Sequence, residues 1–190
     1  MLDCDYRKNR GEETLCCRTF ESASHGHKFP ELSAIEKARI KLAALIHDVG
    51  KIGVDNKLLK KMKLERWEKE QIDKHASYTK EILQRMFSSL KGVDEKEFQE
   101  IIELAAGHHS KPAEAKLGSQ IMAILDHFDA VTSPRAYRID KPALAVERAL
   151  MQIADDAIKH GKYDSGLVER ISDVIRTQAN EVNAVVPKIE

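Results

Sequence analysis

The feature that most limits the fold of this chain is a succession of amphipathic helical patterns that begins at Ser33. Apolar residues recur at intervals of three and four, as on one face of a helix, and no segment carries a convincing strand pattern. The chain of 190 residues is long enough for one domain with a sizeable core. We therefore predict an all-α single domain, a helical bundle with helices over 33–50, 63–87, 94–107, 119–133, 141–161 and 164–182.

Capping residues predict where several of these helices begin and end. Ser33 and Asp164 are typical N-caps, and Asp94 with Glu97 three residues later forms a capping-box pattern. Gly50, Gly107 and Gly161 end helices, and Pro142 lies near a helix start. Residues 52–63 are expected to form an extended or turn-rich connector.

The apolar positions of the first two helices predict which faces are buried. In the first helix the expected buried positions are Ile35, Ala38, Leu42, Leu45 and Ile46. In the second, a single helix over 63–87, they are Trp67, Ile72, Ile82, Leu83, Met86 and Phe87, with His75 on the same side.

Composition excludes several classes of function. The 31 basic and 31 acidic residues cancel, so no overall charge recruits long nucleic acid or an anionic membrane. No apolar run is long enough to span a bilayer, and the polar start shows no signal peptide, so we expect a cytoplasmic protein. The three cysteines, Cys4, Cys16 and Cys17, are interpreted as reduced thiols.

Ionisable residues interrupt segments that otherwise have the composition of core. Any one of them has an ordinary explanation, as a hydrogen-bonded core histidine, a solvated helix end or a cap. Together they require shared compensation, because burying several unpaired polar groups is costly. Imidazole and carboxylate ligands suit Zn, Mn, Fe and Ni, and six candidates would suit a two-metal site. These candidates are His47, Asp48, His75, His108, His109 and Asp126.

Three cations could serve the same site. Lys51 follows Asp48 by one turn, and Arg135 and Arg138 lie in the segment "SPRAYR". Positive charge near a metal site suits a phosphate group. On spacing alone, ordinary surface cations are an equally good interpretation.

The order of these residues resembles a known family. "HDVGKIGV", "LLKKMKLERWEKEQIDKH", "HH", "ILDHFDAVTSPRAYR" and "GKYDSGLVERI" are similar to the HD superfamily of metal-dependent phosphohydrolases. Within it the match is to the HD-GYP subfamily, which hydrolyses cyclic di-GMP. The resemblance covers roughly 33–175, and divides the chain into an N-terminal segment (1–30), an HD-type domain (31–184) and a tail (185–190).

The resemblance implies a role for each candidate residue. His47 and Asp48 would be the HD pair, with Asp48 bridging two divalent transition-metal ions, most typically Mn or Fe. Lys51 would contact the phosphate or the attacking water. The remaining implied roles are ligation of the first ion by Asp126, ligation of the second ion by His75, His108 and His109, and phosphate binding by Arg135 and Arg138.

This sequence departs from the subfamily at three places. The text "HHSKPAEAKLGSQIM" lacks the Gly-Tyr-Pro signature and shortens the loop that shapes the nucleotide pocket. An upstream histidine ligand of the family has no counterpart in "EETLCCRTF". Thr79 replaces a glycine, which would either narrow the site or tighten helix packing. Candidates for the missing ligand are His25, His27, Glu13 and Cys16.

Three functions follow from this pattern. The leading one is a metal-dependent phosphodiesterase that acts on a cyclic dinucleotide, such as cyclic di-GMP, through metal-activated water. A second keeps the enzyme but changes the substrate to a mononucleotide or another small phosphate ester. The alternative is a catalytically inactive HD-GYP-like signalling or binding module. We expect a small nucleotide as ligand and a sensory or receiver-domain protein as a partner, and leave the oligomeric state open.

Overall fold

The computed structural model describes residues 29–61, 63–92, 94–132 and 145–185, and every element in these ranges is helical. The all-α prediction is confirmed; the domain boundaries stay a prediction. The elements are α3 (Ala34–Ile46), η1 (Val49–Gly53), α4 (Asn56–Leu59), α5 (Arg66–Asp73), α6 (His75–Ser88), α7 (Glu95–Ala106), η2 (Gly107–His109), α8 (Leu117–Thr132), α9 (Val146–His160) and α10 (Ser165–Val185).

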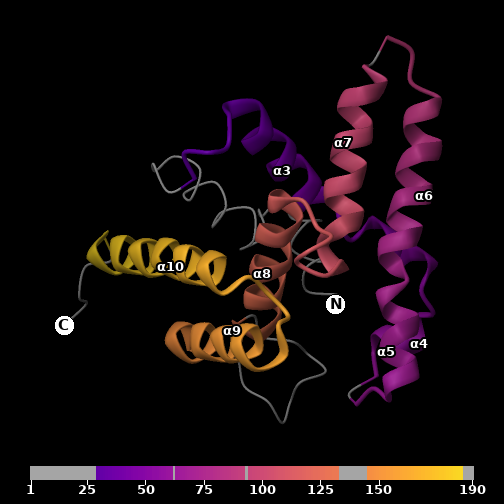
Figure 1. Cartoon of the computed structure of the whole chain (residues 1–190). Coiled ribbons are helices and arrows are strands. Elements are labelled where there is room, and N and C mark those ends of the chain that lie inside the picture. The colour runs from indigo at the N-terminus through magenta and orange to yellow at the C-terminus, as the bar shows by residue number, and fades with distance from the viewer. Residues whose placement is uncertain (1–28, 62, 93, 133–144, 186–190) are drawn as a thin grey trace.

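The helices are arranged around α8 (Figure 1). On one side, α6 and α7 pack as an antiparallel pair, and α3 packs against both α7 and α8. On the other side, α9 and α10 pack against each other and both contact α8. Consequently α8 connects the two halves of the described molecule.

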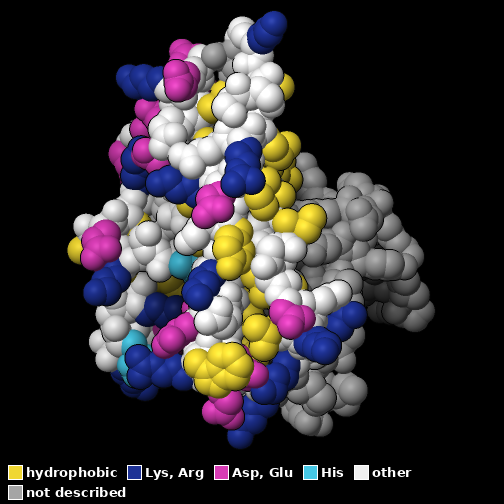
Figure 2. Space-filling model, turned by 90° about the vertical axis from the view of Figure 1, so that its right-hand side faces the viewer, with side chains coloured by type: hydrophobic (Ala, Val, Ile, Leu, Met, Phe, Trp, Pro, Cys, Tyr) yellow, Lys and Arg dark blue, Asp and Glu magenta, His cyan; other side chains and the backbone are white. Residues whose placement is uncertain are grey.

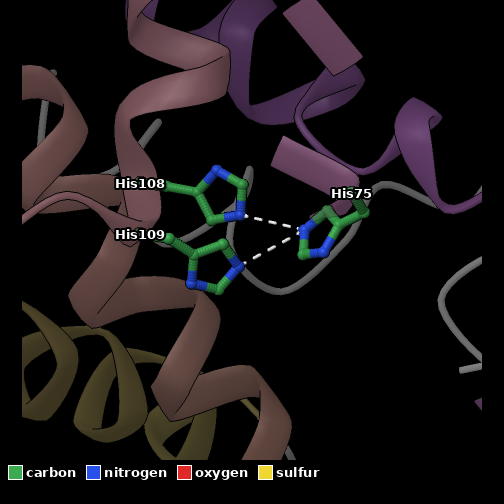
Figure 3. A group of neighbouring side chains, drawn as sticks. All are labelled: His75, His108 and His109. Atoms are coloured by element: carbon green, nitrogen blue, oxygen red, sulfur yellow. Dashed lines mark hydrogen bonds between the residues drawn. The ribbon is translucent and has the colours of Figure 1, made fainter. Parts of the chain in front are cut away.

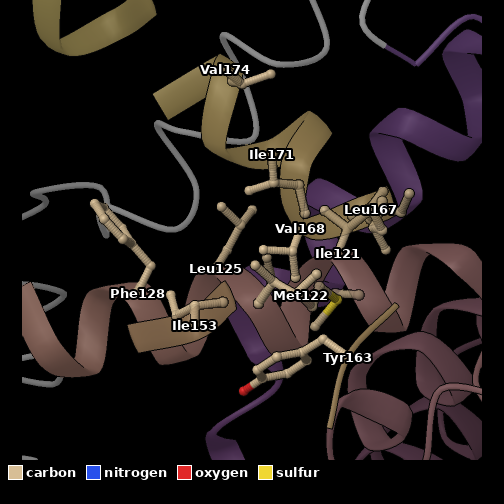
Figure 4. Packing of buried hydrophobic residues seen from close by; sticks show 14 of the residues in the cluster. Ile121, Met122, Leu125, Phe128, Ile153, Tyr163, Leu167, Val168, Ile171 and Val174 are labelled. Carbon is tan, nitrogen blue, oxygen red and sulfur yellow. The ribbon is translucent and has the colours of Figure 1, made fainter. Parts of the chain in front are cut away.

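Most of the core lies where α8, α9 and α10 meet (Figure 4). Side chains such as Ile121, Met122, Ile153 and Ile171 are almost completely buried there. Burial of a large aliphatic side chain stabilises a fold by about 1.5–3 kcal/mol. Packing against α9 and α10 therefore fixes the position of α8. The other side of α8 faces α3, α7 and η2.

The predicted caps are largely confirmed. Ser33 forms a capping box with Glu36, the Asp94 carboxylate accepts from two backbone N–H groups of α7, and Asp164 caps α10. Gly161 ends α9 in the left-handed conformation, with φ 57°. Two predictions are wrong. The Glu97 carboxylate pairs with the Arg39 guanidinium instead of completing a capping box, and the first helix ends at Ile46, so that Gly50 lies within η1.

The predicted buried face of the first helix is wrong at most positions, although Ile46 is partly buried and packs against the core. Ile35 is 61% exposed, and Leu42 and Leu45 are also exposed, whereas Ile40, Ala43 and Ala44 are buried. The reason is the close approach of α8 to α3. A Cβ added at Gly118 of α8 would lie 2.6 Å from the Ile40 side chain, so this interface selects small residues. Ile35, Leu42 and Leu45 lie away from this interface and are exposed.

The single helix predicted over 63–87 is also wrong, because it breaks at Lys74 into α5 and α6. The break changes the direction of the buried face. Trp67 on α5 and Met86 on α6 are more than half exposed, although Leu83 is buried as expected. His75 becomes the first residue of α6 rather than a mid-helix position.

The connector predicted over 52–63 contains more helix than expected. It begins within η1 and includes α4, for which Asp55 supplies the N-cap. Lys61 then binds both carboxylate oxygens of buried Glu68 at 2.6 Å, which fixes α4 against α5. The predicted helix start near Pro142 lies outside the described residues. Among the described helices, none is long and apolar enough to cross a membrane.

Candidate metal centre

Four helical segments bring the predicted ligands together. His47 and Asp48 follow the end of α3, His75 begins α6, and Asp126 lies on α8. His108 and His109 form the η2 turn at the end of α7, and both point toward His75 (Figure 3). The site therefore depends on helix ends, whose positions are fixed by packing.

Three histidines share one orientation. In each, Nδ1 lies within hydrogen-bond distance of the backbone carbonyl oxygen three residues earlier in the chain, to which it can donate. The pairs are His47–Ala44 at 2.8 Å, His75–Ile72 at 2.7 Å and His108–Ala105 at 2.7 Å. A histidine that donates from Nδ1 keeps a free lone pair on Nε2, which is the usual arrangement of a metal-ligating imidazole.

These Nε2 atoms converge. His75 Nε2 lies 3.2 Å from His108 Nε2 and 3.3 Å from His109 Nε2 (Figure 3). In the tautomer in which Nδ1 donates to the backbone carbonyl, the facing Nε2 atoms of His75 and His108 are both hydrogen-bond acceptors. His47 Nε2 is the one buried side-chain N or O atom of the described residues without a hydrogen-bond partner. A cation satisfies both features, because it accepts several lone pairs at once.

The two aspartates complete the cluster. Asp48 lies between two histidines, with Oδ1 3.3 Å from His75 Nε2 and Oδ2 3.5 Å from His47 Nε2. Lys51 Nζ donates to Asp48 Oδ2 at 2.5 Å. Asp126 Oδ1 lies 3.7 Å from His47 Nε2 on the more exposed side of the site. Asp48 is thus close to both His75 and His47.

Two groups of donors are close enough to hold a metal ion. One consists of His75, His108 and His109, and the other of His47, Asp48 and His108. Within each group, one ligand atom per residue lies within 4.8 Å of the others. A divalent cation fits this site for three reasons. The side chains are nitrogen and oxygen donors, His47 Nε2 has no hydrogen-bond partner, and the Nδ1 atoms of three histidines can donate to backbone carbonyls.

The electrostatics of the cluster keep its aspartates ionised. Burial would raise the pKa of Asp48, but His47, His75 and Lys51 outweigh it and hold this pKa well below its usual range. For His47, burial opposes protonation, but Asp48 and Asp126 raise its pKa overall. Burial lowers the pKa of His108 to about 3, assisted by His47. At neutral pH the site therefore offers carboxylates together with a neutral imidazole at His108, which are the forms that bind metals.

Thr79 fixes the turn that carries the HD pair. Its side chain is completely buried, accepts a hydrogen bond from Gly50 N at 2.9 Å and donates to the His47 carbonyl at 2.7 Å. At Gly50 an added Cβ would lie 2.0 Å from the His75 carbonyl oxygen, so the turn and α6 are in direct contact. Of the two alternatives for Thr79, the structure therefore favours tighter packing.

All six predicted ligands are thus in one cluster, and Lys51 contacts it. The structure does not assign their roles. The predicted phosphate-binding residues Arg135 and Arg138 lie outside the described residues, as do His25, His27, Glu13 and Cys16.

A comparison of the sequence with protein families adds independent support. The sequence pattern of the HD domain family matches residues 18–131, more than half of the chain. The chain belongs to the HD domain family. This confirms the family expected from the sequence, and the family match includes every one of the six predicted ligands.

Curated relatives of this HD protein have related names. "3'3'-cGAMP-specific phosphodiesterase 3" of Vibrio cholerae is 31% identical over 66% of this chain and 28% of the relative. "Cyclic di-GMP phosphodiesterase" of Thermotoga maritima is 29% identical over 79% of this chain and 43% of the relative. "Probable cyclic di-GMP phosphodiesterase" of Vibrio cholerae is 30% identical over 76% and 36%. The matched regions span less than half the length of these relatives.

Sequence reasoning missed a second polar group beside Asp126. His127 Nδ1 lies 2.9 Å from the Tyr163 hydroxyl and 3.5 Å from Lys162 Nζ. Burial and the nearby Lys162 lower the pKa of His127 to about 4. The available signal was His127 itself, a second ionisable residue inside the apolar pattern of α8.

Proposed function

We propose that this HD protein is a metal-dependent phosphohydrolase that cleaves a phosphodiester bond, with a cyclic dinucleotide as its substrate. The observation that carries the proposal is the convergence of the Nε2 atoms of His75, His108 and His109 beside an ionised Asp48. An inert core would satisfy such nitrogens with hydrogen-bond donors. The names of the curated relatives support the substrate class.

The proposed site holds two divalent ions, with Mn and Fe as the favoured metals. His75, His108 and His109 would hold one ion, His47 and Asp126 the other, and Asp48 would contact both. Such ions polarise a phosphoryl oxygen and lower the pKa of water, and so supply a nucleophile at neutral pH.

Lys51 and Asp48 act as a unit in this proposal. Lys51 Nζ donates to Asp48 Oδ2 at 2.5 Å, which places the ammonium beside the proposed metal ions, where it would contact a phosphoryl oxygen or the attacking water. In the hydrolysis, the water oxygen bonds to phosphorus, the bond to one ribose oxygen breaks, and a proton passes to that leaving oxygen. Arg135 and Arg138 stay proposed phosphate contacts.

The distribution of charge on the surface is consistent with binding of the substrate by a few residues at the site. Lys and Arg side chains are interspersed with Asp and Glu on the face drawn in Figure 2, and the whole chain has no net charge. An anionic substrate is therefore bound by particular cations at the site rather than by a large basic surface.

The test combines metal analysis with a substrate panel. The purified protein is analysed for bound metal and assayed with cyclic di-GMP, 3'3'-cGAMP, mononucleotides and bis(p-nitrophenyl) phosphate under Mn, Fe, Co, Ni and Mg. We expect bound transition metal and hydrolysis of a cyclic dinucleotide. Asp48→Asn should lower the rate by at least about a hundredfold. The control is Asp155→Asn, an exposed carboxylate paired with Lys159, which should leave the rate unchanged.

One sequence feature favours a second candidate, a binding module without turnover. The segment between His109 and Asp126 is short and lacks the Gly-Tyr-Pro signature. This candidate is supported if a cyclic dinucleotide binds while none of the panel substrates is hydrolysed under any of the metals. Hydrolysis that survives Asp48→Asn would instead reject the proposed mechanism.

A further inference from the structure

The two adjacent histidines of the metal centre depend on the orientation of one short turn. His108 and His109 both belong to η2, and their Nε2 atoms lie 3.2 and 3.3 Å from His75 Nε2 (Figure 3). Neighbouring residues of a helical turn point about 100–120° apart. Two adjacent histidines therefore reach the same nitrogen only from a narrow range of turn orientations, so the contacts of η2 also orient these ligands.

A buried hydroxyl on α8 contacts the point where α7 continues into this turn. Ser119 is 1% exposed, and its Oγ donates to the Leu104 carbonyl at 3.1 Å. Leu104 lies in the last turn of α7, where the carbonyl groups have lost the N–H partners that a continuing α-helix would supply. The hydrogen bond therefore links the end of α7 to α8, the helix that carries Asp126.

Steric contact on both sides of this hydrogen bond leaves little room for movement. An added Cβ at Gly107, the first residue of η2, would lie 2.7 Å from Ser119 Oγ and 3.2 Å from Ser119 Cβ. At the preceding residue of α8, a Cβ added to Gly118 would lie 2.6 Å from the Ile40 side chain and 2.7 Å from the Leu104 side chain. The start of α8 is therefore packed directly against α3, α7 and η2.

We propose that Ser119 is a positioning residue for the metal centre. It holds η2 against α8, and so sets where His108 and His109 lie relative to Asp126. Ser119 acts through the turn and does not bind the ion itself. This inference rests on the metal centre of the proposed function, and it is independent of which substrate is hydrolysed.

The test measures metal affinity in Ser119→Ala. Kd values for Mn and Co are obtained by competition with a chelator, and circular dichroism checks that each metal-free variant has the helix content of the wild type. We expect Ser119→Ala to raise Kd about tenfold, as for loss of a group that supports metal ligands. No change in Kd would overturn the proposal.

The matched control is Ser172→Ala, which removes a buried hydroxyl that donates within α10 to the Val168 carbonyl. Because α10 carries none of the six ligands, this variant should keep Kd within about twofold of the wild-type value, as expected for distant sites. An equal rise of Kd in both serine variants would show a general loss of rigidity and would overturn the role of Ser119.

A double-mutant cycle with His109 asks whether Ser119 acts through the ligands. If it orients the histidine pair, removing one of these ligands should remove much of its effect. We expect Ser119→Ala to raise Kd less than about threefold in a His109→Ala background, because residues that act through each other are not additive. The full rise in both backgrounds would contradict a positioning role.

Gly107→Ala tests the same contact from the side of η2, and it also serves if Ser119→Ala does not fold. The new Cβ meets Ser119 Oγ and should displace the turn, so we expect Kd to rise about tenfold. In the Ser119→Ala background the oxygen is gone, and Gly107→Ala should add less than about twofold. Unchanged metal affinity in Gly107→Ala would overturn the proposal.

The result is separable from the outcome for the proposed function. A wild type that binds metal but hydrolyses none of the panel substrates refutes the phosphodiesterase proposal, and the Kd values still decide the role of Ser119. A wild type that hydrolyses a cyclic dinucleotide while Ser119→Ala binds metal normally refutes the role of Ser119 alone. A wild type that binds neither Mn nor Co overturns both.

Discussion

Two polar clusters lie on either side of Asp126, and they treat their histidines in opposite ways. In the metal-centre cluster (His47, Asp48, His75, His108, His109 and Asp126), ring nitrogens face other ring nitrogens and His47 Nε2 has no hydrogen-bond partner. In the His127 cluster (His127, Gln152, Asp156, Lys162 and Tyr163), His127 Nδ1 lies 2.9 Å from the Tyr163 hydroxyl, which can donate a hydrogen bond to it.

This difference separates a histidine that can bind a metal ion from a histidine that only stabilises the fold. Both kinds are largely buried, so burial alone does not separate them. The deciding property is what the second ring nitrogen meets. A backbone carbonyl at Nδ1 leaves Nε2 for a ligand, as at His75, whereas a hydroxyl donor at Nδ1 uses that lone pair, as at His127.

Metal addition should give the largest contrast between the clusters. Mn at a hundredfold excess over its Kd should raise the free energy of unfolding by about 3 kcal/mol relative to chelated protein. Asp48→Asn should remove more than half of this increment, and His127→Asn should leave it intact. Chemical unfolding with and without chelator measures the increment. An equal loss in both variants would show that the clusters are not distinct.

The next largest effect concerns the support of the metal-centre cluster. Thr79→Val keeps the shape of the side chain but leaves Gly50 N–H and the His47 carbonyl without their partner. We expect a loss of about 2 kcal/mol of unfolding free energy. Ser172→Ala is the matched control, because that buried hydroxyl donates within its own helix to the Val168 carbonyl. A similar cost for both variants would contradict the role of Thr79 as a link between helices.

A change of pH should distinguish the clusters in metal-free protein. The pKa of His127 is lowered to about 4 from its usual 6.5, so acid protonates the unfolded chain first. Between pH 7 and 5.5 this should cost about 1 kcal/mol of stability. In the metal-centre cluster the raised pKa of His47 opposes the lowered pKa of His108. His127→Gln should therefore flatten the pH dependence measured by urea unfolding; an unchanged slope would refute this assignment.

The smallest expected effect is that of Tyr163→Phe, which removes one hydrogen bond from the His127 cluster. We expect a loss of between about 0.5 and 1 kcal/mol, with bound metal unchanged. Tyr78→Phe serves as the control, since its ring packs near Gly53 in the other half of the molecule. Thermal unfolding with metal analysis checks both variants. A loss of metal in Tyr163→Phe would mean that the two clusters share one function.

The sequence predicted the ligand cluster better than the helix faces. Several ionisable residues in apolar segments have few ways to be compensated, so His47, His75 and Asp126 could be grouped before their positions were known. Helix faces lack such a constraint. Leu42 and Ile40 have similar hydropathy, and only the close approach of α8 at Gly118 decides which of them is buried.

Positions that depend on a break or on a distant contact could not be predicted. The break at Lys74 carries no proline or glycine signal in the sequence. The contact between the Tyr163 hydroxyl and His127 Nδ1 joins residues that are 36 positions apart, and no local pattern relates them. The choice between the two roles of Thr79 likewise required its partners at Gly50 and His47.

The position of Thr79 one turn after His75 has a further consequence for how ions exchange. Because α6 carries both a ligand and the link to the HD turn, any tilt of this helix displaces His47 and His75 together. The turn that carries the HD pair is therefore packed directly against α6. Asp126 and His109 are the more exposed members of the cluster, so the proposed ions would enter the site past these two side chains.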